Sequence, residues 1–254
     1  EHAVVARDLA MHYGEGEART QVLFGVNLAV ERGSFTAVIG PSGSGKSTLL
    51  NLLSLLERPT GGEIIVEGVS SAAMDPASLA RFRNMTMGFV FQFHYLLPEF
   101  TALENVLIPV WIRYGEASAE AQAEARRLLD RLGVSSAAHK RPTQMSGGQQ
   151  QRTAIARALI NRPRIVYADE PTGNLDRESG DAALTLLREL VREQGTTLVM
   201  VTHDREIALR ADRIIEMVDG RVCRSFDLHA QTVAAVRRML DERICTPASH
   251  GMTQ

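Results

Sequence analysis

Cysteine and long apolar runs are scarce in this sequence. The 254 residues include two cysteines, Cys223 and Cys245, without a paired motif, so they indicate neither a disulfide framework nor a zinc site. The longest apolar runs, such as 106–112, fall far short of the ~20 residues that span a bilayer. Residues 1–5 lack the basic stretch followed by an apolar stretch with which a secretory signal peptide begins, so no signal peptide is expected. Any role at a membrane therefore requires a partner.

An excess of charge of one sign is also missing. The 28 Lys and Arg residues nearly balance 30 Asp and Glu residues, which gives a net charge of −2. Nucleic-acid surfaces usually show an excess of basic residues, so no nucleic-acid partner is expected, although a local basic patch stays possible. With 44% apolar residues, the chain has the composition of a globular protein with one large domain or a core and a subdomain.

Hydrophobic periodicity divides the chain into a core, an insertion and an extension. Strands are expected at 4–13, 22–30, 35–39, 63–67 and 88–91, with a leucine-rich helix at 47–56. The alternation resumes further on, with strands at 165–168, 196–201, 214–218 and 222–226 and helices at 179–194 and 205–211. Residues 1–97 and 162–226 therefore predict an α/β core with a mainly parallel sheet.

Residues 98–161 have a helical hydrophobic pattern without the strand alternation of the core. Thr101 and Glu104 have the spacing of a capping box, and Pro109 is expected to break or kink the segment after this cap. Helices are expected at 118–132 and 149–160, and no strand pattern interrupts them. We interpret 98–161 as an inserted α-helical subdomain and 227–254 as a C-terminal extension, with a helix at 230–243 and a frayed polar tail at 246–254. All of these parts belong to one domain, 1–254.

The segment after the third expected strand has the pattern of a phosphate-binding P-loop. Gly40, Gly45, Lys46 and Ser47 occupy its four required positions. Glycines let backbone N–H groups turn toward phosphate oxygens, Lys46 adds a charge for the β- and γ-phosphates, and Ser47 is placed to bind Mg²⁺. The following helix adds its positive end. Taken alone, such a loop shows only that a nucleoside triphosphate binds, because GTPases, kinases, helicases and transporters all carry it. The residues predicted to bind the nucleotide, ATP in the interpretation reached below, are Gly40, Pro41, Ser42, Gly43, Ser44, Gly45, Lys46, Ser47 and Thr48.

Two later motifs contribute a second helix start that favours a phosphate and a pair of carboxylates. Met145-Ser146-Gly147-Gly148-Gln149 stands before a helix, where free N–H groups favour a phosphate. Residues 164–170 form an apolar strand that delivers Asp169 and Glu170 to its carboxyl end, the edge at which open α/β sheets bind ligands. Taken alone, the first motif could be an ordinary helix entry and the second a solvated turn. Their order after a P-loop argues for function.

Together these motifs resemble the ATP-binding cassette (ABC) ATPases. The resemblance covers 4–226 and includes a P-loop core, an N-terminal antiparallel β part and an inserted helical subdomain. Met145 departs conservatively from the leucine of the family's signature. The resemblance implies that Ser146, Gly147, Gly148 and Gln149 contact the γ-phosphate held by an opposite subunit. It further implies that Asp169 holds Mg²⁺ and that Glu170 is the general base.

Three single residues match further positions of the same family. Gln92 ends the 88–91 strand where the family has a glutamine that approaches Mg²⁺. His203 follows the strand 197–202 where the family has a histidine that hydrogen-bonds the γ-phosphate. Tyr13 stands where an aromatic side chain stacks on adenine, with a simple core tyrosine as its rival. The resemblance thus implies catalysis by Glu170 and His203, and Mg²⁺ binding by Ser47, Gln92 and Asp169.

Length and local sequence indicate which kind of ABC protein this is. About 100 residues separate Ser47 from Ser146, too few for the long coiled coils of chromosome-maintenance relatives, and only one cassette is present. Residues 91–106 are similar to the lipoprotein-releasing ATPase branch and its macrolide-exporter and cell-division relatives. In that branch the segment 92–106, which begins with Gln92, contacts an integral membrane permease.

The expected protein is the ATPase subunit of a bacterial transporter or mechanotransmission complex. The resemblance implies a dimer, of two copies or with a close homologue, that closes around two Mg-ATP molecules and lies in the cytoplasm on the inner face of the membrane through its permease. The alternative is a soluble ABC-type ATPase that acts on nucleic acid or ribosomes.

Overall fold

The computed structural model describes residues 1–242, so the expected polar tail at 246–254 lies outside the described residues. The N-terminal part forms a four-stranded antiparallel sheet in the order β2-β1-β4-β5. Its strands are β1 (His2–Tyr13), β2 (Thr20–Glu31), β4 (Gly61–Val66) and β5 (Val69–Ser70), with a short 3₁₀ turn, η1 (Gly16–Ala18), between β1 and β2. The expected N-terminal antiparallel part is confirmed.

A second sheet has six strands in the order β10-β9-β3-β8-β7-β6. Its five parallel strands are β6 (Met87–Phe91), β7 (Ile165–Asp169), β8 (Thr197–Val201), β3 (Phe35–Ile39) and β9 (Arg213–Val218). The last strand, β10 (Arg221–Asp227), runs antiparallel to β9. The mainly parallel sheet is confirmed. The carboxyl ends of β3, β7 and β8 meet at one edge because these strands are neighbours in parallel register.

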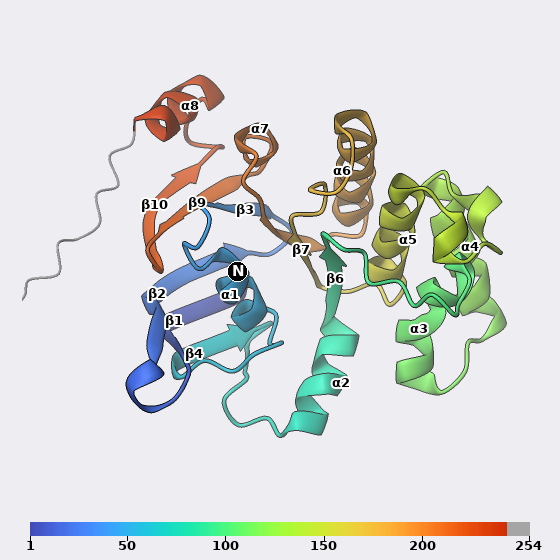
Figure 1. Cartoon of the computed structure of the whole chain (residues 1–254), viewed down its shortest axis with the longest axis horizontal. Helices are drawn as coiled ribbons and strands as arrows, with labels where there is room; N and C mark the ends of the chain where they lie inside the picture. Colours follow the sequence, from blue (N-terminus) through green and yellow to red (C-terminus); the bar gives the residue numbers. More distant parts are fainter. Residues whose placement is uncertain (243–254) are drawn as a thin grey trace, which may run out of the picture.

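Successive residues of the central strands face two different cores. In β3, Ala37 and Ile39 belong to one apolar cluster and Val38 to the other. Both faces of the sheet are therefore buried, as expected for a parallel sheet with cover on each side. Helix α1 (Lys46–Leu53) fills the space between the two sheets (Figure 1), and its four buried leucines belong to the second cluster.

Three long helices form a group beyond β6, at one end of the large sheet (Figure 1). They are α3 (Ala102–Tyr114), α4 (Ala119–Arg131) and α5 (Gly147–Leu159), with the short turns η2 (Ser135–Ala137) and η3 (Pro142–Gln144) between the last two. The capping box of Thr101 and Glu104 is present. Of the two outcomes expected at Pro109, a break or a kink, the break is wrong, because α3 continues through this proline to Tyr114.

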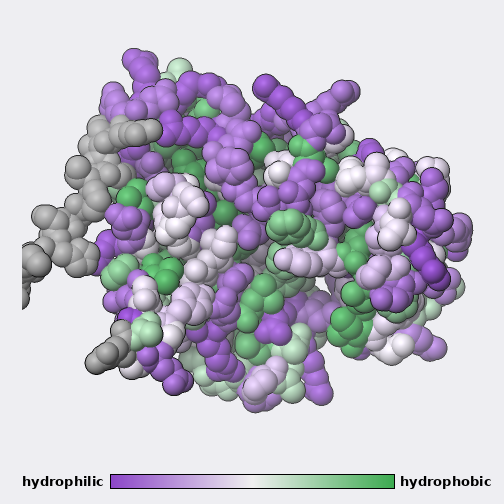
Figure 2. Space-filling view, in the orientation of Figure 1, coloured by the Kyte–Doolittle hydropathy of each residue, from purple (hydrophilic) through white to green (hydrophobic). Residues whose placement is uncertain are grey.

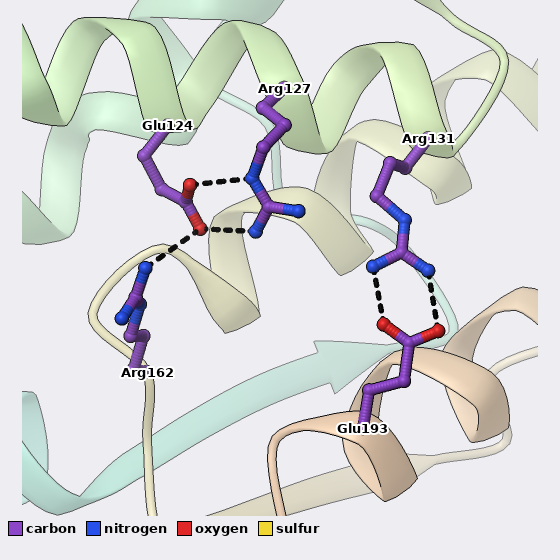
Figure 3. A network of polar contacts seen from close by, with 5 residues as sticks. All are labelled: Glu124, Arg127, Arg131, Arg162 and Glu193. Carbon is purple, nitrogen blue, oxygen red and sulfur yellow. Dashed lines mark hydrogen bonds and ion pairs between the residues drawn. The ribbon is translucent and has the colours of Figure 1, made fainter.

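Ion pairs join this helical group to the rest of the molecule (Figure 3). Arg131 of α4 forms a bidentate pair with Glu193 of α6 (Arg177–Glu193), at 2.5 and 2.7 Å. Glu124, also on α4, binds Arg127 at 2.7 Å and approaches Arg162, which follows α5, at 3.8 Å. Hydrogen bonding with Arg127, aided by the charge of Arg162, lowers the pKa of Glu124. These contacts fix α4 against elements distant in sequence.

Two elements differ from the expected pattern. No element is expected from the sequence between the strand at 63–67 and the strand at 88–91, where the structure has α2 (Pro76–Thr86). The helix expected at 205–211 is the single turn α7 (Arg205–Ala208). In the extension, α8 (Val233–Asp241) buries Val236 and Leu240. Two ion pairs join α8 to α7, Arg205 with Asp241 at 2.8 Å and Arg237 with Glu206 at 2.5 Å.

The face shown in Figure 2 carries no large apolar patch, because apolar residues are scattered among hydrophilic ones. Within residues 1–242, no helix combines the length and the apolar character that crossing a bilayer requires.

Candidate active site

The P-loop joins β3 to α1, and two of its glycines are required by close contacts. A Cβ on Gly40 would lie 2.2 Å from the carbonyl oxygen of Met217, and one on Gly45 would lie 2.8 Å from the side chain of Leu23. Gly45 is the N-cap of α1, with φ of 92° and no side-chain capping bond. The first N–H groups of α1 are therefore left for a ligand, and the positive end of the helix favours an anion there.

Lys46 is held over this loop by two hydrogen bonds to backbone carbonyl oxygens. Its Nζ donates to the carbonyl oxygens of Gly40 and Pro41, at 2.9 and 2.8 Å. Burial lowers the pKa of Lys46, and the nearby carboxylates of Glu170 and Asp169 oppose that shift. An added anion would stabilise this ammonium, because it stands in a partly desolvated site between carbonyl dipoles.

Asp169 and Glu170 lie at the carboxyl end of β7, beside the P-loop. The hydroxyl of Ser47 donates to Oδ1 of Asp169 at 3.4 Å. Burial raises the pKa of Asp169, while the bond from Ser47 opposes the rise. Glu170 has φ of 44°, and its N–H donates to the carbonyl oxygen of Val201 on β8. Its Oε1 is 2.9 Å from Nδ1 of His203, so the two predicted catalytic residues are in direct contact.

These residues surround a cavity of about 420 Å³. It is lined by Val22, Ser42, Gly43, Gly45, Lys46, Ser47, Thr48, Glu170, Val201 and His203. Ser44 forms the turn of the loop, where its N–H donates to the carbonyl oxygen of Pro41. The structure therefore brings together the predicted P-loop, Asp169, Glu170 and His203. Val22 and Val201 are not predictable from sequence, because their apolar side chains carry no motif.

The oxygen atoms of this cavity fit a magnesium ion. No group of three or more His, Cys, Asp or Glu side chains that could hold a metal exists in the part of the chain that is described. Mg²⁺ does not need one, because it keeps several waters and takes the rest of its octahedron from one or two carboxylates and phosphate oxygens. Ser47 and Asp169, in hydrogen-bond contact, supply such a donor set.

Gln92 and Tyr13 lie outside the lining of the cavity. The side-chain amide of Gln92 donates to Asn174 at 3.3 Å, and Asn174 donates back to the carbonyl oxygen of Gln92 at 2.9 Å. Tyr13 is 40% exposed, and its hydroxyl donates to Glu57 at 2.6 Å. Burial and the bond to Glu57 raise the pKa of Tyr13, and a hydrogen bond with Thr48 opposes this. Tyr13 thus contacts Thr48, which lines the cavity, but does not line the cavity itself.

The four signature residues lie at the start of α5; they are Ser146, Gly147, Gly148 and Gln149. Ser146 is the N-cap of α5, and it forms a capping box with Gln149: the Ser146 hydroxyl accepts from the Gln149 N–H, and the Gln149 side chain accepts from the Ser146 N–H. None of the four lines the 420 Å³ cavity. Figure 1 places α5 and α1 on opposite sides of β6. Within one chain, these residues do not complete the site that the P-loop begins.

Known proteins resemble this chain in sequence over most of its length. Residues 23–173 match the family described as ABC transporter. A lipoprotein-releasing system ATP-binding protein LolD of Anaeromyxobacter dehalogenans is 56% identical over 210 residues, which cover 83% of this chain and 88% of that protein. A LolD protein of Shewanella frigidimarina is 48% identical over 212 residues, 84% of this chain and 88% of that protein.

Solved structures agree with the sequence relatives. The ATP-binding cassette MJ0796, in a dimeric post-hydrolysis state with ADP and Pi, superposes with a TM-score of 0.82. It is 42% identical and covers 89% of this chain and 98% of its own. The protein cbiO1 of Clostridium perfringens, part of the ABC transporter complex cbiONQ, gives a TM-score of 0.81 at 27% identity, with 96% of each chain covered. This chain therefore belongs to the ABC transporter family, as a cassette that binds and hydrolyses ATP.

Proposed function

We propose that this chain is the ATPase subunit of a lipoprotein-releasing transporter, and that it works as a dimer closed around two Mg-ATP molecules. One observation carries the dimer: the cavity contains the P-loop, Glu170 and His203 but none of the signature residues Ser146 to Gln149. A second chain, turned head to tail, would bring its own α5 N-terminus to the open side of this cavity. Closure would then depend on ATP, because the bridging contacts exist only in the closed state.

The chain's own residues have distinct roles in this proposal. The N–H groups of the P-loop and Lys46 bind and orient the phosphates, while Ser47 and Asp169 would hold Mg²⁺. The metal supplies charge neutralisation at the phosphates when it is bound. Glu170 accepts the proton of the attacking water, and His203, at 2.9 Å from it, orients the carboxylate and meets the γ-phosphate. Tyr13 offers its ring to adenine, and Gln92 links Mg²⁺ to the segment that begins with it.

The segment 92–106 offers a surface for a membrane permease. Phe93, Tyr95 and Leu97 are 64%, 61% and 44% exposed, although each has a large apolar side chain. Exposed apolar groups in one segment are typical of a protein interface. The relatives named LolD belong to lipoprotein-releasing systems, which supports a permease of that kind and a place on the cytoplasmic face of the inner membrane.

A Glu170→Gln variant tests the proposed mechanism. It removes the proton acceptor and keeps the shape and the P-loop, so ATP binds but is not consumed, and the closed dimer accumulates. We expect a loss of turnover by about 100-fold or more. Size-exclusion chromatography should show a dimer with Mg-ATP and a monomer with Mg-ADP.

Two results would contradict this mechanism: a Glu170→Gln chain that stays monomeric with Mg-ATP, or one with normal turnover. The lipoprotein assignment has its own test, affinity purification from membranes, which should recover an integral membrane permease. Stimulation of the ATPase by DNA or RNA, with no such permease recovered, would instead favour the soluble alternative.

A further inference from the structure

Gln151, on α5, is a polar side chain with none of its surface exposed. Its Nε2 donates to the carbonyl oxygen of Pro171 at 2.5 Å, and its Oε1 is 2.5 Å from Nδ1 of His94. Pro171 directly follows Glu170, and His94 lies two residues after Gln92. One buried amide thus joins the loop of the catalytic carboxylate to the segment that leaves β6.

The hydrogen bonds of Gln151 fix the proton on His94. The carbonyl oxygen of Pro171 can only accept, so the NH₂ group of Gln151 must face it. The Oε1 of Gln151 therefore faces His94, and because this oxygen can only accept as well, Nδ1 of His94 must carry a hydrogen. The connection has a defined direction, from His94 to Gln151 to Pro171.

Both ends of this connection have strained backbone. Glu170 has φ of 44°, and the consecutive residues His94 and Tyr95 have φ of 41° and 46°, a region that side chains other than glycine rarely adopt. Such conformations persist only where surrounding contacts hold them, and they gather at functional sites. Arg157, also on α5, helps to hold the backbone at His94 and Tyr95. Its guanidinium donates to the carbonyl oxygens of these two residues, at 2.5 and 2.6 Å.

We propose that Gln151 and His94 are positioning residues for Glu170. Gln151 anchors the Pro171 carbonyl and so holds the strained peptide that aims the Glu170 carboxylate into the cavity; His94 fixes the orientation of the Gln151 amide. Gln151 does not line the cavity, so its effect on hydrolysis passes through the two segments that it bonds, and its bond to Pro171 is the one next to Glu170. A displacement of the segment around His94 would reach Glu170 by the same path.

Steady-state ATP hydrolysis by the isolated full chain tests the role of Gln151. Gln151→Leu keeps the size and removes both bonds; we expect kcat to fall about tenfold with KM for ATP unchanged, because a small misplacement of a catalytic group slows chemistry while the P-loop still binds. Thr153→Val is the matched control. Thr153 is equally buried on α5, but its hydroxyl bonds only to its own helix, and its loss should leave kcat unchanged.

A pair of variants at His94 tests the direction of the connection. Asn tolerates positive φ and offers an amide N–H near the place of Nδ1, so His94→Asn should keep kcat within about twofold, whereas His94→Ala, without a donor, should lower it about fivefold. Adding Gln151→Leu to His94→Ala should cause little further loss, because both act on one connection. If Gln151→Leu does not fold, as judged by its thermal transition, the His94 pair decides alone.

A spectroscopic readout separates positioning from general stability. In ¹⁵N-labelled protein, the His94 ring should show a protonated Nδ1 in the wild type, and this signature should be lost or exchange-broadened in Gln151→Leu. The proposal is overturned by an unprotonated Nδ1 in the wild type, by wild-type kcat in Gln151→Leu, by equal losses in Gln151→Leu and Thr153→Val, or by equal losses in His94→Asn and His94→Ala.

Discussion

Some residues around the cavity have close backbone contacts or positive φ angles that few other residue types would tolerate. Gly40 approaches the carbonyl of Met217 too closely for any Cβ, and its own carbonyl oxygen accepts a hydrogen bond from Lys46. Glu170 adopts a left-handed conformation that turns its carboxylate toward His203. The site is thus built from the P-loop and the start of α1 together with the carboxyl ends of β7 and β8, and Val22 of β2 completes the lining.

Tyr13 allows a direct test of adenine binding at the residue scale. If its ring stacks on adenine, Tyr13→Ala should raise the Kd for ATP by about three- to tenfold, since aromatic stacking contributes about 0.5–1.5 kcal/mol. Tyr13→Phe keeps the ring and loses only the hydroxyl's hydrogen bonds, to Glu57 and Thr48, so its Kd should stay within about twofold of the wild type. Titration with a fluorescent ATP analogue measures both. Equal affinities for the Ala and Phe variants would assign Tyr13 to packing alone.

Residues that act through a local motif can be predicted from sequence. The P-loop, Asp169, Glu170 and His203 each stand in a recognisable local pattern, and the structure gathers them at one cavity. Gln151 has no such pattern, because its partners lie 20 and 57 residues away in the chain. Gln151 is a polar residue among the buried positions of α5, and the sequence alone does not indicate which groups it bonds.

At the scale of elements, capping residues set most boundaries as expected. Thr101 caps α3 in the capping box that its spacing to Glu104 predicted, and Ser118 and Ser146 cap α4 and α5 with a side-chain bond close to the predicted starts at 118 and 149. Asp75 and Pro76 are a readable start signal for α2, although no helix was predicted there, since Asp75 accepts from two N–H groups of the first turn. Pro109 shows the opposite error: packing of α3 outweighs the bond that proline removes.

Helix α8 is the element whose role the sequence left open, and burial indicates a structural one. Leu240 is 1% exposed on its inner side, whereas Val233 on the same helix is 46% exposed. Leu240→Ala should lower the free energy of unfolding by about 2–4 kcal/mol, through lost burial and a cavity. Val233→Ala should change it by less than about 0.5 kcal/mol. Urea unfolding measures both, and equal effects would show that α8 does not hold the fold.

For the whole molecule, α/β class, strand alternation and the helical insertion follow from hydrophobic periodicity. The sheet orders do not, because the pairing of β3 with β8 and β9 joins segments more than 150 residues apart and depends on tertiary packing. The separation of the signature from the cavity is likewise a property of the folded chain. In the proposed dimer, hydrolysis would depend on both chains, since each would supply the signature residues that the other's cavity lacks.

Analytical ultracentrifugation of two variants with Mg-ATP tests this central claim most directly. The Glu170→Gln chain should sediment as a dimer, because it retains its nucleotide. Adding Ser146→Arg should leave the ATP affinity of a single chain unchanged, as Ser146 lies outside the cavity, yet keep the chain monomeric, because the added side chain blocks the partner's phosphate. A dimer of equal stability in both variants would contradict the account.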